Sequence, residues 1–136
     1  MSLLSTCSLF VGLPDEMIDD MLKNVHHQIR HYHKDDVIAF AGDSCLALLI
    51  VTEGIVVAEM SNFDGRSIRI EELSAPTTLA EAFVFGQQST FPVTIIALSD
   101  CSILSIPVDE LLKLFRLQTI VMRNFLDSIS NRTQFL

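Results

Sequence analysis

The chain has 136 residues, of which 49% are hydrophobic, and its formal net charge at pH 7 is -8. A chain of this length fits one domain with a sizeable buried core. The excess of acidic residues argues against direct binding to nucleic acid or to an anionic membrane, because both need clustered Lys and Arg side chains.

The three cysteines, Cys7, Cys45 and Cys101, lie far apart and form no Cys-x-x-Cys motif. Their odd number and wide spacing argue against a disulfide framework, a zinc knuckle or an iron–sulfur cluster. We therefore expect free, buried thiols and no cofactor. The apolar runs are too short for a transmembrane helix and the N-terminus lacks signal-peptide features, so we expect a cytoplasmic protein.

Residues 9–23 are predicted to form a short helix. Pro14 suits its first turn, and Asp15 and Glu16 follow where the helix dipole favours negative charge. Apolar residues at helical spacing then indicate one face against the core.

Residues 26–33 contain four histidines in a polar segment that favours a strand. On a strand, His27, His31 and His33 share one face, and alternate histidines can bind zinc or copper. However, no carboxylate or thiol lies nearby at ligand spacing. We therefore expect an exposed strand and no metal site.

Glycines punctuate the middle of the chain at intervals typical of short antiparallel strands. Gly42 and Gly54 are 12 residues apart, and Gly54 and Gly65 are 11 apart. This spacing indicates an all-β sandwich or barrel. The predicted strands cover residues 37–40, 46–52, 55–60, 67–73, 93–98 and 102–106.

After Pro107 the pattern becomes helical, with predicted helices at 108–115 and 118–136. The second helix carries an apolar seam near a 3.5-residue period, which is typical of helix pairing. The seam consists of Met122, Phe125, Ile129 and Leu136. The sequence ends within this helix without a Gly or Pro stop, so we expect it to be part of a longer protein.

Three stretches together resemble the sensor domain of the CRP/FNR family of bacterial transcription regulators. They are Leu9-Phe10-Val11-Gly12-Leu13-Pro14, Leu49-Ile50-Val51-Thr52-Glu53-Gly54, and Thr94-Ile95-Ile96-Ala97 followed by residues 103–107. The resemblance implies a mainly β fold with flanking helices. This fold is a double-stranded β-helix or jelly-roll β-barrel of the cyclic-nucleotide-binding-domain type, followed by a long C-terminal dimerisation helix. Residues 1–117 would form the sensor domain, and 118–136 would begin the dimerisation helix.

Members of this family that bind cyclic AMP have a phosphate-binding cassette, in which a Gly-Glu pair contacts the ribose and an Arg neutralises the phosphate. Here Ala80-Glu81 matches the opening, but Phe91 and Pro92 occupy the positions of the Arg and of the hydroxyl residue after it. Residues 70–112 contain no Lys, Arg or His. Without the charge-assisted contact to the phosphate, we expect no cyclic nucleotide binding.

The same resemblance implies a pocket re-lined for an apolar or uncharged effector. Its candidate residues are Glu81, Ala82, Phe83, Phe85, Phe91 and Thr94. The alternative is that Glu81 is a solvated or backbone-capping carboxylate and that the aromatic residues simply fill the core.

The main functional hypothesis is an effector-sensing domain that forms a parallel homodimer through residues 118–136, with no membrane partner. DNA would be bound only by a helix-turn-helix domain missing from this chain. A charge at Phe125 or Ile129 should then dissociate the dimer and leave the β-domain folded. The alternatives are a cupin-like metal-binding β-barrel that uses His31-x-His33, and a purely structural dimerisation module. No nucleophile–base pattern indicates an enzyme.

Overall fold

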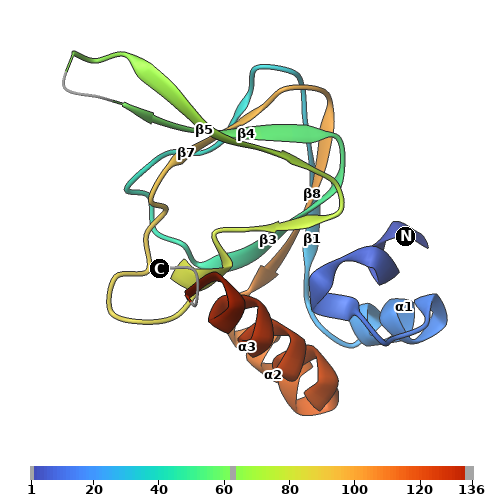
Figure 1. Cartoon of the computed structure of the whole chain (residues 1–136). Helices are drawn as coiled ribbons and strands as arrows, with labels where there is room; N and C mark the ends of the chain where they lie inside the picture. The colour runs from blue at the N-terminus through green and yellow to red at the C-terminus, as the bar shows by residue number, and fades with distance from the viewer. Residues whose placement is uncertain (1, 62–63, 134–136) are drawn as a thin grey trace.

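Two four-stranded antiparallel sheets face each other in the computed structural model, which describes residues 2–61 and 64–133. Their strand orders are β1-β8-β3-β6 and β2-β7-β4-β5 (Figure 1). The strands are β1 (Gln28–Tyr32), β2 (Val37–Ala39), β3 (Ala47–Glu53), β4 (Ile55–Ser61), β5 (Ser67–Ser74), β6 (Thr77–Leu79), β7 (Thr94–Ala97) and β8 (Cys101–Pro107). The mainly β fold with C-terminal helices, predicted from the sequence, is confirmed.

Helices flank the sheets at both ends of the chain. Short 3-10 helices η1 (Ser2–Thr6) and η2 (Ser8–Phe10) precede α1 (Asp15–Lys23). After β8 come α2 (Val108–Leu117) and α3 (Thr119–Thr133). Figure 1 shows α2 and α3 next to the sheet that contains β3 and β8. None of the helices in the described part of the chain is long and apolar enough to cross a membrane.

The sheet β1-β8-β3-β6 has two differently buried faces because side chains alternate along each strand. Its helix-facing side contains four side chains with 0% exposure: Leu48, Ile50, Leu104 and Ile106. Burying one such side chain contributes about 1.5–3 kcal/mol to folding. The opposite side faces the second sheet, and it includes Val51 and Ile103, which are cross-strand partners. The site described below lies on this inner face.

A tight reversal joins β3 to β4 at Gly54. Its φ is +95°, a left-handed conformation that favours glycine. A Cβ at this position would collide with the carbonyl oxygen of Asp100 and with Cys101. The expected hairpin is wrong, because β3 and β4 belong to different sheets and the turn carries the chain from one sheet to the other. This turn needs glycine both for its backbone angle and for the close approach of the turn before β8.

The sequence prediction missed three local features. The predicted helix over 9–23 is interrupted at Gly12, and α1 begins only at Asp15, with Pro14 as its N-cap. Strand β6 and the 3-10 turn η3 (Glu81–Phe83) lie within a stretch for which no regular element was predicted. Both are only three residues long, too short for a hydrophobic period to be visible.

Candidate ligand-binding site

A cavity of about 330 Å³ lies on the inner face of the sheet β1-β8-β3-β6. This volume is near the lower end of the ~300–1,000 Å³ range that is usual for small-molecule sites. Its walls come from β1, β2, β3, β8 and the loops beside them. The lining residues are Arg30, Tyr32, Ile38, Ala39, Asp43, Ser44, Leu46, Ala47, Leu49, Phe91, Ile103 and Ser105.

Phe91 is the one predicted effector residue among those that line this cavity. Its backbone N–H donates to the carbonyl of Asp43 at 2.9 Å, and its carbonyl accepts from Gly42 N–H at 2.8 Å. These two bonds fix the loop before β7 against the β2–β3 turn. The Phe91 side chain is therefore held at the cavity wall, at the position where the family resemblance places the phosphate-binding Arg.

Four other predicted residues are not among those that line the cavity. Ala82 and Phe83 are exposed on η3. Phe85 packs edge-on against Phe125 of α3, with ring centroids 5.8 Å apart. Thr94 accepts a hydrogen bond from Ala41 N–H through Oγ1 at 3.0 Å. Phe85 and Thr94 thus contribute to local packing, and the four residues are not brought together at this cavity.

Glu81, the sixth predicted residue, is buried with 2% of its surface exposed. Its Oε2 accepts a hydrogen bond from Thr78 Oγ at 2.9 Å, and its Oε1 accepts one from Ser128 Oγ of α3 at 2.6 Å. The alternative interpretation of Glu81 as a solvated carboxylate is therefore wrong. Its carboxylate links the 3-10 turn η3 to the C-terminal helix.

The charge of Glu81 affects the thiol of Cys7 in the N-terminal segment. Burial raises the pKa of the Cys7 thiol, a backbone hydrogen bond from Leu9 partly offsets this, and the negative charge of Glu81 raises the pKa further. Burial also raises the pKa of Cys45. The predicted free and buried thiols are confirmed for all three cysteines, including Cys101.

The histidines of residues 26–33 have hydrogen-bond and charge partners of their own. His31 Nδ1 lies 2.9 Å from Ser102 Oγ, and His27 Nδ1 lies 2.9 Å from the carbonyl of Val25. The exposed His33 has its Nδ1 3.7 Å from Asp100. Among the described residues, no group of three or more His, Cys, Asp or Glu side chains is placed to hold a metal ion.

The sequence analysis missed the two largest polar residues at the cavity, Arg30 and Tyr32. Both lie on β1, where Arg30 pairs with Ile103 and Tyr32 pairs with Cys101. Cross-strand partners project to the same face, so the cavity-lining Ile103 places Arg30 on that face as well. Alternation along residues 28–32 would have grouped these two residues, but it could not show which face is buried.

The conserved-family model for the cyclic nucleotide-binding domain matches residues 29–118, most of the chain. This chain belongs to the cyclic nucleotide-binding domain family. The matched region includes the cavity, the turn η3 and strands β1 to β8 almost completely. No curated protein is a significant sequence match to the chain.

Several solved structures share the fold of this family member. A transcriptional regulator from Thermotoga maritima has a TM-score of 0.79 at 24% identity, with 87% of this chain and 90% of that chain covered. The Thermus thermophilus catabolite activator protein has a TM-score of 0.81 at 23% identity, with 93% and 58% covered. The sensor domain of the regulator DNR from Pseudomonas aeruginosa has a TM-score of 0.78 at 19% identity, with 96% and 85% covered. The resemblance to CRP/FNR sensor domains is thus confirmed in fold, and the family that the sequence match shows is that of cyclic nucleotide-binding domains.

Proposed function

We propose that this cyclic nucleotide-binding-like domain senses a small molecule other than a cyclic nucleotide, and that it forms a homodimer through α3. The observation that carries the sensing role is the cavity between the sheets, which has Phe91 on its wall. Cavities of this size that combine apolar walls with a few polar groups are typical ligand sites.

Side-chain contacts connect the segment between η3 and β7, which lines the cavity, to helix α3. The segment that contains Phe91 follows η3 in the chain, and Glu81 of η3 accepts a hydrogen bond from Ser128 of α3. Phe85 lies between them and packs against Phe125. A ligand that moves the loop before β7 therefore acts on a segment whose other end is bonded to α3.

The distribution of apolar side chains on α3 supports the dimer. Val121 and Phe125 are buried against the rest of the chain, whereas Met122 and Leu126 are 38% and 52% exposed. Met122, Leu126 and the half-buried Ile129 have the i, i+4, i+7 spacing of one helix face. We call these three residues the α3 stripe.

The α3 stripe differs from the predicted seam at one position. Phe125 is 2% exposed and packs against Phe115 and Phe85, so Leu126 takes its place on the outer face. We expected a charge at Phe125 to leave the β-domain folded, and the burial of this side chain does not support that expectation. Leu136, the last predicted seam residue, lies outside the described residues.

The proposed regulatory role belongs to a larger assembly. This chain covers 58% of the Thermus thermophilus catabolite activator protein chain. We propose that any DNA contact is made by a helix-turn-helix domain outside this sequence, and that residues 118–136 transmit the state of the sensor to it.

A cavity-filling variant tests the sensing role. Ala47 is half-buried on the cavity wall, so Ala47→Leu occupies ligand space, whereas Ala82→Leu adds the same atoms on the exposed turn η3. Melting temperatures would be measured with a panel of anionic, cationic and neutral metabolites. We expect compounds that raise the melting temperature of the wild type and of Ala82→Leu but not of Ala47→Leu. Stabilisation that survives Ala47→Leu, or no stabilisation of the wild type by any compound, would contradict the proposal.

A further inference from the structure

A positive charge lies at the inter-sheet cavity, although the cassette segment provides none. Arg30 of β1 is among the lining residues, and its register partner Ile103 is 2% exposed on the same wall. In the cyclic-AMP-binding proteins that this chain resembles, the positive charge that contacts the phosphate comes from the loop before β7. Here that loop contributes Phe91, and the cation comes from a different strand.

Arg30 has most of its hydrogen-bonding capacity left for a ligand. Its Nη2 donates to Gln28 Oε1 at 3.2 Å, and a guanidinium has five N–H donors. Ion pairs within residues 2–61 and 64–133 include those of His33 with Asp100, Arg69 with Glu59, and Arg123 with Asp127. Arg30 is in none of them, so an incoming anion would not have to displace a carboxylate.

The other charged residue at the cavity limits the charge of the ligand. Asp43 also lines the cavity, from the β2–β3 turn, and its Oδ2 accepts a hydrogen bond from Phe40 N–H at 3.1 Å. One guanidinium balances one negative charge, and a second negative charge on the ligand would be repelled by Asp43. A singly charged anion therefore fits this pair better than a phosphate monoester.

The remaining wall is suited to a short apolar body. Ile38, Leu49, Phe91 and Ile103 supply apolar surface, and the hydroxyl-bearing Tyr32 and Ser105 also line the cavity. Arg pairs with carboxylates through two parallel N–H···O bonds, which fixes orientation as well as charge. The volume of about 330 Å³ leaves room for a small molecule only.

We propose that the inter-sheet cavity binds a small organic monocarboxylate, with its carboxylate on Arg30 and its apolar part against Ile38, Leu49 and Phe91. This inference rests on the proposed sensing role of the same cavity. It replaces the uncharged effector expected from the sequence with a singly negative one.

Calorimetry with three probes of similar shape tests which ligand charge the cavity prefers. Isocaproate, isocaproamide and isoamyl phosphate share a branched apolar body and differ in carrying one negative charge, none, or up to two. We expect the wild type to bind isocaproate at least about tenfold more tightly than the other two, because the amide lacks a charge to pair with Arg30 and the phosphate carries more negative charge for Asp43 to repel.

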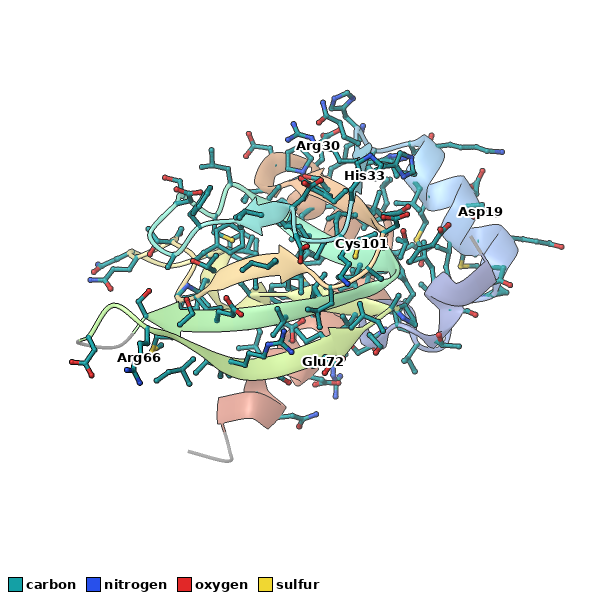
Figure 2. All side chains as sticks on the ribbon, turned by 90° about the horizontal axis from the view of Figure 1, so that it is seen from above. Asp19, Arg30, His33, Arg66, Glu72 and Cys101 are labelled. Carbon is teal, nitrogen blue, oxygen red and sulfur yellow. The ribbon has the colours of Figure 1, made fainter. Side chains whose placement is uncertain are left out.

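A charge-removing variant with a matched control locates the contact. Arg30→Gln should weaken isocaproate binding by about tenfold or more, while isocaproamide binding stays unchanged. The control is Arg66→Gln, because Arg66 is exposed in the turn before β5, and Figure 2 shows it at a different edge of the molecule from Arg30. It loses the same formal charge and should bind isocaproate like the wild type.

The possible failures are distinguishable. Equal affinity for isocaproate and isocaproamide, or isocaproate binding that survives Arg30→Gln, would overturn the charge assignment and leave the cavity as a ligand site. Binding that survives Ala47→Leu would overturn the proposed sensing role as well. Absence of binding by all three probes at millimolar concentration would also overturn the monocarboxylate proposal, and the metabolite panel would then decide whether the cavity binds anything else.

Discussion

At the scale of single residues, we propose that Phe91 and Glu81 restrict the ligands that this family member accepts. Phe91 offers an apolar ring where the resemblance places a phosphate-binding Arg, and Glu81 is already bonded to Thr78 and Ser128. We therefore expect neither the phosphate contact nor the ribose contact of a cyclic nucleotide from these positions.

We predict that cyclic AMP and cyclic GMP do not bind to the chain at micromolar concentration. We expect that Arg30 does not replace the missing contact, because it reaches the cavity from β1 and not from the segment that matches the cassette. Isothermal titration calorimetry at physiological ionic strength provides the measurement. A dissociation constant in the micromolar range for either nucleotide would show that the cassette still works without its Arg.

The raised pKa values of Cys7 and Cys45 predict how stability depends on pH. Both thiols have a higher pKa in the folded chain than the ordinary value of 9.0, so the unfolded chain loses these protons first. Their contribution is fully present below that value and is lost as the pH rises above it. We expect the free energy of unfolding to fall between about pH 8.5 and 9.5.

Urea unfolding at closely spaced pH values measures this effect, with the double variant Cys7→Ala, Cys45→Ala as control. The variant starts from a lower stability because two buried side chains are shortened, but its pH dependence over this interval should be flatter. If both proteins show the same slope, other groups must be responsible for the decrease.

At the scale of elements, the contact between η3 and α3 depends on one buried carboxylate. Hydrogen bonds to charged groups contribute about 1.5–3 kcal/mol, so Ser128→Ala should lower the free energy of unfolding by about this amount. Ser130→Ala is the matched control, because Ser130 is exposed on the same helix and should change stability by less than about 0.5 kcal/mol. Equal effects of the two substitutions in urea unfolding would argue that the Glu81–Ser128 bond is energetically unimportant.

The sequence predicted the longer elements well because their patterns are local. Short apolar runs mark β3, β4 and β8, and Gly54 marks the reversal between β3 and β4. The three-residue elements β6 and η3 escaped because a period cannot be read over so few positions.

The candidate site was less predictable because its contacts join distant parts of the chain. Glu81 meets Ser128 across 47 residues, and the position of Arg30 follows from its pairing with β8. A polar strand such as residues 28–32 gives no indication of which side faces the interior. Near-heptad spacing likewise could not show that Phe125 faces inward and Leu126 outward.

At the scale of the whole molecule, the charge of -8 bears on the proposed role in transcription. Binding to DNA depends on neutralising phosphates with Lys and Arg, and this chain has 9 such residues against 17 acidic ones. We predict no shift of duplex DNA in a gel at physiological salt. A sequence-specific shift by this chain alone would contradict the proposal that DNA contact lies outside it.

Assembly through the α3 stripe is the central claim that concerns the whole molecule. Leu126→Glu puts a carboxylate on an outer face that the proposed dimer buries, where an unpaired charge is costly. Because Leu126 is 52% exposed, this substitution should leave the monomer folded. Phe125→Glu should instead lower the melting temperature sharply, because it places a charge in the core beside Phe85 and Phe115.

Sedimentation equilibrium at micromolar concentration is the most direct test of this claim. The wild type is expected to sediment as a dimer. Leu126→Glu is expected to sediment as a monomer with a wild-type circular dichroism spectrum and melting temperature. A wild-type chain that sediments as a monomer, or a Leu126→Glu variant that remains dimeric, would contradict the proposed dimer.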